Sequence, residues 1–183
     1  QRGNSEGHDL YGTYSQDHKP FVEQRKAVGH SVRAGYFYAG ATDIAALTGS
    51  NEYDESIFSI WEDIVQHKTY LTGGIGSEPH IEGFGPDYEL PNATAYTETC
   101  AAISMMLWNH RLFLLTGDVK YMDVFERTLY NGFLPGISLE GDTYFYPNPL
   151  ESDGKYEFNH GMIKRSPWFD TACCPVNIVR VLP

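Results

Sequence analysis

Basic residues are scarce in this chain of 183 residues. Lys and Arg number 13 against 24 Asp and Glu, which gives a formal net charge of −11 at pH 7. Nucleic acids and anionic membrane surfaces attract clusters of Lys and Arg. The composition therefore argues against a nucleic-acid partner and against a membrane partner.

Long apolar runs are also absent. No stretch approaches the roughly 18 uninterrupted apolar residues that a membrane-spanning helix needs, and the N-terminal residues lack the pattern of a signal peptide. The chain begins with Gln1 and ends in IVRVLP, a run that reads as a helix. We expect it to be a piece of a longer protein, whose compartment the sequence does not indicate.

Cysteine is rare too, with Cys100 alone and Cys173 beside Cys174. An odd number fits poorly with a disulfide framework, and two adjacent cysteines could bond to each other only through a strained ring. We therefore expect free thiols or thiolates bound to a metal.

Four helices are indicated by the spacing of the apolar residues and by the residues that follow each run. They are expected at residues 21–48, 51–71, 101–117 and 118–134. A fifth, short helix could follow Cys174. These expectations predict an all-α fold.

A repeat relates the first pair of helices to the second. LTGSNEY begins at Leu47 and LTGDVKY at Leu115, and each places a Gly at a helix end with a capping side chain after it. In the second copy Asp118 is the expected cap. The natural unit is a hairpin of two helices followed by a long loop, so we expect part of an α/α toroid.

Two long segments between helices are rich in Gly, Pro and aromatic residues. Residues 72–94 should contain no helix or long strand, and residues 141–177 could include a short β-hairpin. Loops of this length in compact domains usually serve a function or are disordered. Their Phe, Tyr, Ile and Leu favour a functional role.

The cysteines and one acid suggest a metal site, although ordinary readings remain. Glu98 and Cys100 would point about 200° apart on a regular helix, so they can meet only where the backbone is irregular, for example if Thr97 caps a helix there. Pro175 favours an extended backbone at Cys174, which would place both thiols at a turn. One carboxylate and three thiolates suit tetrahedral Zn²⁺, but a lone Cys100 could equally be a small buried apolar residue.

Five motifs together resemble the β-L-arabinofuranosidase family of glycoside hydrolases, family 127 and its relatives. They are GHSVRA (29–34), YLTGGIGS (70–77), ELPNATAYTETCA (89–101), ERTLYNGFLPGIS (126–138) and TACCPVN (171–177). The resemblance runs from about Tyr14 to the end of the chain. It implies an (α/α)6 barrel followed by β-sandwich domains, with residues 1–183 holding part of the catalytic barrel and no sandwich.

The resemblance also implies a reaction and a set of site residues. The reaction is hydrolysis of β-L-arabinofuranosides with retention of configuration, which releases L-arabinose from an arabinofuranoside-containing oligosaccharide or glycan. The implied residues are Cys173 as nucleophile, Glu82 as acid/base, Glu98, Cys100, Cys173 and Cys174 as ligands of Zn²⁺, and His30, Glu126 and Tyr146 as substrate contacts.

The acid/base residue rests on its place in the loop. Glu78, Asp87 and Glu89 are competing acids, and the family position favours Glu82. We expect burial near Ile81 and Phe84 to raise its pKa, as a general acid requires. The chain is shorter than the family pattern between residues 150 and 170, so no role is carried over there.

Two alternatives remain open at this point. His30 could be an ordinary packed or capping histidine. The whole chain could be a non-catalytic helical module that binds carbohydrate or acts as a scaffold, with a purely structural zinc. A structural site closes all four ligands, whereas a catalytic one keeps a ligand or position exchangeable. As part of a toroid the chain would also expose apolar helix faces, so it could form an oligomer.

Overall fold

The computed structural model describes residues 12–181, and the tails at 1–11 and 182–183 lie outside that range. The expected helical character is confirmed. The α-helices are α1 (Ser31–Thr48), α2 (Asn51–His67), α3 (Thr99–Thr116), α4 (Lys120–Arg127) and α5 (Cys174–Ile178). Short 3-10 segments lie at Phe21–Glu23 and Leu134–Gly136, and a π-helical turn at Thr128–Phe133.

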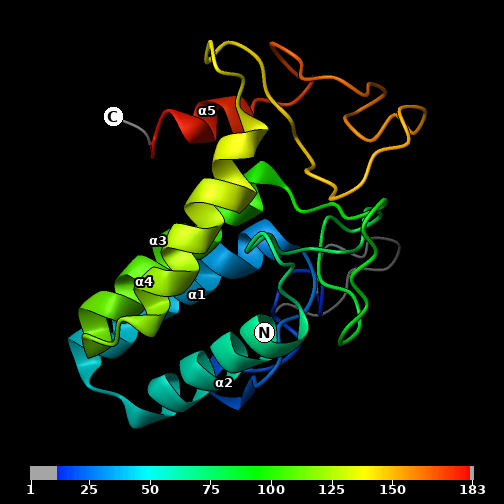
Figure 1. Cartoon of the computed structure of the whole chain (residues 1–183). Coiled ribbons are helices and arrows are strands. Elements are labelled where there is room, and N and C mark those ends of the chain that lie inside the picture. Colours follow the sequence, from blue (N-terminus) through cyan, green and yellow to red (C-terminus); the bar gives the residue numbers. More distant parts are fainter. Residues whose placement is uncertain (1–11, 182–183) are drawn as a thin grey trace.

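The repeated helical hairpins are confirmed. Gly49 and Gly117 end α1 and α3 in the left-handed conformation, with φ of 63° and 71°, which glycine adopts without a steric penalty. Asp118 was expected to cap the next helix, but the N-cap of α4 is Val119, one residue later. Asp118 still contributes, because its Oδ1 accepts a 3.0 Å hydrogen bond from the backbone N–H of Lys120. Figure 1 shows α1 and α2 as one hairpin beside α3 and α4.

Three expected helix bounds are wrong. The second helix, expected to reach residue 71, ends at His67. The helix expected from residue 21 begins only at Ser31, because Gly29 takes a φ of +72° that breaks any helix before it. The last helix expected to residue 134 is α-helical only as far as Arg127 and then continues as the π-helical and 3-10 turns. Pro135, which has no N–H to donate, lies in the last of these turns.

The core lies where α1 packs along α3. Tyr38 and Trp108 are fully buried, with ring centroids 5.0 Å apart. The indole N–H of Trp108 donates to Thr42 Oγ1 at 3.0 Å, so its polar edge is satisfied inside the core. Trp61 of α2 donates in the same way to Asn109 of α3 at 2.8 Å. These bonds join the two hairpins.

The long loops lie together on one side of the helices (Figure 1). As expected, residues 72–94 contain no helix or strand; instead, Lys68 holds the loop by donating to Asp63 at 2.7 Å and to Asp87 at 2.6 Å. The expected β-hairpin is reduced to single antiparallel bridges of Tyr144 with Ile137 and with Ser166. Within residues 12–181 no helix is long and apolar enough to cross a membrane.

Candidate metal and catalytic site

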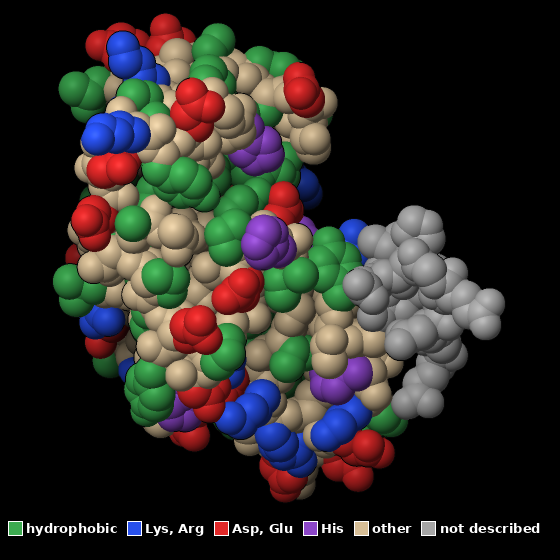
Figure 2. All heavy atoms as spheres, turned by 90° about the vertical axis from the view of Figure 1, so that its right-hand side faces the viewer, with side chains coloured by type: hydrophobic (Ala, Val, Ile, Leu, Met, Phe, Trp, Pro, Cys, Tyr) green, Lys and Arg blue, Asp and Glu red, His purple; other side chains and the backbone are tan. Residues whose placement is uncertain are grey.

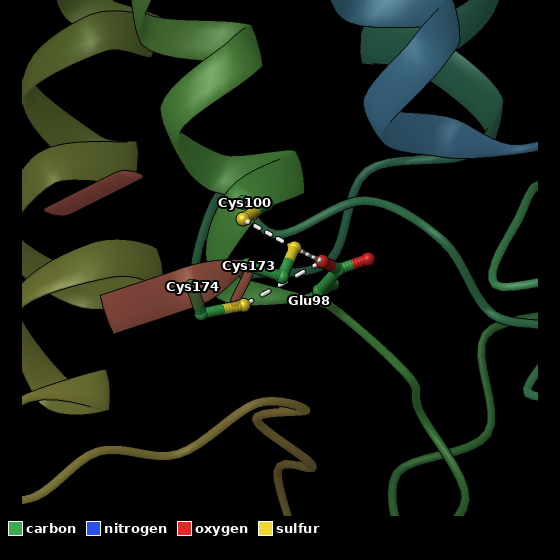
Figure 3. Close-up of side chains that lie close together, drawn as sticks. All are labelled: Glu98, Cys100, Cys173 and Cys174. Atoms are coloured by element: carbon green, nitrogen blue, oxygen red, sulfur yellow. Dashed lines mark hydrogen bonds between the residues drawn. The ribbon is translucent and has the colours of Figure 1, made fainter. Parts of the chain in front are cut away.

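Three thiols and one carboxylate meet where α3 and α5 begin. Cys100 Sγ lies 3.2 Å from Cys173 Sγ. Glu98 Oε1 lies 3.3 Å from Cys173 Sγ and 3.5 Å from Cys174 Sγ. Figure 3 shows the four side chains pointing toward one another from the two helix starts. The tertiary fold therefore brings together the four residues expected to bind a metal.

The start of α3 explains how Glu98 and Cys100 can meet. Glu98 is the N-cap residue, with φ −59° and ψ 140°, so its side chain does not follow the helical rotation that would separate it from Cys100. The irregular backbone was expected, but Thr97 as the cap was wrong by one residue. The extended backbone expected at Cys174 is also wrong, because Cys174 is the first residue of α5 and the irregular residue is Cys173.

Burial and hydrogen bonding control the protonation of this cluster. Burial raises the pKa of Glu98 and of Cys174 well above their ordinary values. Hydrogen bonding with Cys173 raises the pKa of Cys100. Hydrogen bonds from Cys100 and Cys174 in turn hold the pKa of Cys173 far below that of a free thiol. Without a cation, Cys173 is the favoured thiolate of the group.

The donor set is suited to a metal ion. All three cysteines are free thiols, and the four donor atoms lie within 4.8 Å of one another. The second oxygen of Glu98 is buried and has no hydrogen-bond partner, which is costly unless something charged compensates it. A cation would remove that cost and would favour the deprotonated thiols. The cluster could therefore hold a metal.

Glu82 lies at a strained turn beside the start of α1. Its φ is +50°, an uncommon value for a residue with a side chain. The backbone N–H and the hydroxyl of Ser31 both donate to the Glu82 carbonyl, at 3.1 and 2.9 Å. The helix start thus fixes the backbone of this loop and directs the carboxylate inward.

Two side chains hold the Glu82 carboxylate. His30 Nε2 lies 3.2 Å from Oε2, and the hydroxyl of Tyr96 donates to Oε1 at 2.8 Å. His30, Glu82 and Glu98 also offer ligand atoms within 4.8 Å of one another. The expected acid/base residue and the expected histidine therefore lie directly beside the thiol cluster, and His30 is more than a packed histidine.

The expected rise in the Glu82 pKa is wrong. Hydrogen bonding from His30 lowers the pKa of Glu82, and this effect, with the bond from Tyr96, outweighs the opposing effect of burial. Phe84 is buried as expected, but Ile81 is exposed, so the apolar surroundings are weaker than the sequence indicated. The surroundings of Glu82 therefore favour its ionised form.

The two remaining predicted contacts have different positions. Tyr146 is buried and packs with Cys100 and Cys174 in one apolar cluster, so it joins the site. Glu126 is exposed on α4 and lines a separate hollow with Asp123 and Arg127. Its role as a substrate contact stays a prediction that no observed contact supports.

Two residues of the site were missed by the sequence reasoning. Tyr96 binds Glu82 and also packs near the cysteines, and Phe169 packs edge-on against Tyr146 with ring centroids 5.3 Å apart. The only available signal for Tyr96 was its place in the motif before Glu98. Nothing in its spacing pointed to Glu82.

Known proteins are similar to this chain in sequence and in fold. The family described as "Beta-L-arabinofuranosidase, GH127 catalytic domain" matches residues 4–183. A non-reducing end β-L-arabinofuranosidase of Bifidobacterium longum is 40% identical over 174 residues, which are 93% of this chain and 26% of that protein. The chain thus spans about a quarter of the length of this curated relative.

Solved structures agree with the sequence match. A GH127 β-arabinofuranosidase is 57% identical with a TM-score of 0.86, covering 92% of this chain and 26% of its own. A GH127 β-L-arabinofuranosidase from Geobacillus stearothermophilus T6 is 42% identical with the same TM-score, covering 92% of this chain and 27% of its own. These matches confirm the prediction that the helical hairpins form part of an (α/α)6 barrel. Because the match to this family extends over residues 4–183, nearly the whole chain, the chain belongs to the GH127 β-L-arabinofuranosidase catalytic-domain family.

Proposed function

We propose that the protein containing this chain hydrolyses β-L-arabinofuranosides with retention of configuration and releases L-arabinose. The chain acts as part of a longer catalytic (α/α)6 barrel, and the β-sandwich domains lie outside it. The observation that carries the proposal concerns the Glu98 carboxylate. Cys173 lies in hydrogen-bonding contact with it, and Glu82 and His30 lie beside it. A sugar bound at this place could therefore contact both the proposed nucleophile, Cys173, and the proposed acid, Glu82.

The metal of this proposal is zinc. Zinc–sulfur bonds of about 2.3 Å and zinc–oxygen bonds of about 2.0–2.2 Å place the donors of a tetrahedral site roughly 3.5–3.8 Å apart. The separations of 3.2, 3.3 and 3.5 Å lie at the lower limit of that range or up to about 0.3 Å below it. Glu98, Cys100, Cys173 and Cys174 would hold the ion, which when bound keeps the thiols deprotonated at neutral pH.

In the first step the Cys173 sulfur attacks the anomeric carbon of the sugar. A C–S bond forms while the glycosidic C–O bond breaks, and Glu82 gives its proton to the departing oxygen. In the second step Glu82 takes a proton from water, the water oxygen bonds to the anomeric carbon, and the Cys173 thiolate leaves. Two inversions return the original configuration. A thiolate thus takes the place of the carboxylate nucleophile that most retaining enzymes use.

The proton on Glu82 requires a change on substrate binding. In the free chain His30 stabilises the ionised carboxylate and lowers its pKa. A sugar that takes over the hydrogen bond of His30 and excludes water would raise that pKa toward the value a general acid needs. Tyr96 would hold the carboxylate in place through its 2.8 Å bond.

The exposure of Cys173 favours an enzyme over a scaffold with structural zinc. Three of the four residues are almost fully buried, with about 1% or less of their surface exposed: Glu98, Cys100 and Cys174. Cys173 is only partly buried. A structural site closes all its ligands, and a catalytic site keeps one accessible. The accessible member here is the expected nucleophile.

The test is metal analysis of the whole protein together with its activity on a panel of p-nitrophenyl furanosides. We expect about one zinc per chain and hydrolysis of the β-L-arabinofuranoside. The Cys173→Ala variant should lose at least about 10⁴-fold in kcat, in the range seen on removing a nucleophile. Exposed Asp170→Asn, three residues away, is the matched control and should retain activity. Hydrolysis that survives in Cys173→Ala would refute the proposed nucleophile.

A further inference from the structure

A hollow of about 290 Å³ opens beside Glu82. Its lining includes Glu82 and Tyr96 together with the segment that carries Tyr156, Glu157 and Phe158. Figure 2 looks onto the side of the molecule where the long loops lie, with histidine, acidic and apolar side chains close together on it. Residues 150–170 had no role assigned from the sequence, so the hollow gives this segment a place beside the site.

The hollow includes the expected acid but not the expected nucleophile. Among the described residues, its lining contains neither Cys173 nor His30 nor any other member of the thiol cluster. In glycoside hydrolysis the sugar that is attacked lies between the nucleophile and the acid, and the acid protonates the oxygen of the departing part. A space that borders the acid alone therefore suits the departing part of the substrate.

The segment that carries Tyr156 and Phe158 is held in place by the buried residue that follows it. The fully buried Asn159 accepts a hydrogen bond from the backbone N–H of Tyr146 and donates to the carbonyl of Lys164, both at 2.8 Å. His160, which follows it with a φ of +52°, stacks on Tyr146 with ring centroids 4.3 Å apart. The wall of the hollow is thus fixed to a residue of the site itself.

The lining matches a small neutral polyol. Tyr156 and Phe158 offer aromatic faces, and Glu82 and Glu157 offer carboxylate oxygens that accept hydrogen bonds from hydroxyl groups. Besides these two carboxylates the lining that residues 12–181 provide contains His160 but no Lys or Arg that would attract an anion, and the chain as a whole carries a net charge of −11. The volume lies at the lower end of the range of about 300–1,000 Å³ for ligand pockets, which suits one sugar unit.

We infer that this hollow binds the leaving group, and that it takes a single neutral sugar in preference to an acidic one. The inference rests on the proposed glycosidase function and deepens it. Tyr156 supplies the face on which the departing sugar rests, and Glu157 supplies the charge that excludes uronic acids. Neither residue takes part in bond making.

The experiment compares two substrates of the whole protein that share the same L-arabinofuranosyl group. One is a β-linked L-arabinofuranosyl disaccharide, whose second sugar fills the hollow, and the other is methyl β-L-arabinofuranoside, whose methyl group cannot. We expect Tyr156→Ala to lower the ratio of kcat/KM for the disaccharide to that for the methyl glycoside by about tenfold, equivalent to about 1.4 kcal/mol. Tyr156→Phe keeps the ring and should keep the ratio within about threefold.

A second variant tests the charge. Glu157→Gln should raise kcat/KM several-fold for a substrate whose leaving sugar carries a carboxylate, relative to the neutral disaccharide. An unchanged ratio in Tyr156→Ala, with both substrates still cleaved, would overturn the leaving-group site while leaving the glycosidase function intact. If the wild-type protein cleaves neither substrate, the proposed function fails and this inference fails with it. Activity on the methyl glycoside also reports that each variant is folded.

Discussion

Glu82 shows how strongly single neighbours set the chemistry of a side chain. The sequence places it near apolar residues, which by themselves would raise its pKa. In the folded chain His30 and Tyr96 bind both carboxylate oxygens, at 3.2 and 2.8 Å, and the pKa is lowered. Under the proposed mechanism, Glu82 would therefore act as an acid only in the complex with substrate, where the bound sugar would change these contacts.

Replacing Glu82 with Gln should separate substrates by their leaving groups. Natural glycosides need the proton, so we expect a loss in kcat of about 10²–10⁴-fold. An aryl glycoside has a good leaving group and should react in its first step nearly as before, then stall because no base activates water. Rapid-mixing kinetics should show a burst of phenol, and intact mass should show a pentosyl adduct on Cys173.

The control for this variant is Glu89→Gln. Glu89 is an exposed acid of the same loop and should leave both substrates unaffected. A phenol burst from the aryl glycoside that is slowed as strongly as the hydrolysis of natural glycosides would argue against Glu82 as the acid.

Among the elements, the start of α1 positions two parts of the candidate site. It binds the Glu82 loop through Ser31, and it presents His30 one residue after Gly29. Gly29 has a φ of +72°, and a Cβ there would lie only 2.1 Å from the carbonyl oxygen of Thr13. A residue with any side chain would therefore have to move the backbone that places His30.

Gly29→Ala should both destabilise the protein and impair the site. Positive φ costs about 1 kcal/mol or more, and the clash with backbone adds to it, so we expect a loss of at least about 2 kcal/mol in the free energy of unfolding, measured by denaturant titration. Gly49→Ala is the matched control, because its φ is +63° but a Cβ would meet open space. It should cost only about 1 kcal/mol. Equal losses in the two variants would show that the close approach at Gly29 does not matter.

At the scale of the whole chain, the candidate metal cluster joins the starts of α3 and α5, two helices that also pack together through Ile178 and Ile103. Cys100 belongs to α3, and Cys173 and Cys174 lie at the start of α5. Besides the cluster, Tyr36 of α1 donates a 2.9 Å hydrogen bond to Asn177 of α5. Metal bound at about 1,000 times its dissociation constant would add about 4 kcal/mol to stability.

Chelation should therefore lower the melting temperature of the whole protein. We expect a shift of a few degrees, since 1 kcal/mol corresponds to roughly 2–4 °C in domains of about 150–250 residues and to less in a larger one. Scanning calorimetry before and after removal of zinc measures it. The double variant Cys100→Ser, Cys174→Ser should melt low and should not respond to the chelator. A wild-type melting temperature that is unchanged after metal analysis confirms removal would contradict a stabilising role of the site.

Local sequence signals were sufficient for the existence and order of the main helices, whereas the set of four candidate metal ligands rested largely on the resemblance to a known family. Helix ends at Gly49 and Gly117, the hairpin repeat, and the loop character of residues 72–94 depend on neighbours in the chain, so they can be read from it. The start of α1 was missed because the conformation of Gly29 depends on its contact with Thr13 and Tyr14. The expected oligomer stays a prediction.

The sequence by itself determined the helical hairpins and their ends, because capping and periodicity act over a few positions, and its motifs determined which thiols and acids are candidates. Only the packed fold decided the contacts of Tyr96 and His30 with Glu82 and the lowered pKa of Glu82 that follows from them. The same is true of the hollow that Tyr156, Glu157, Phe158 and His160 help to line. They join segments that are remote along the chain, and such segments meet only when the helices and loops between them have packed.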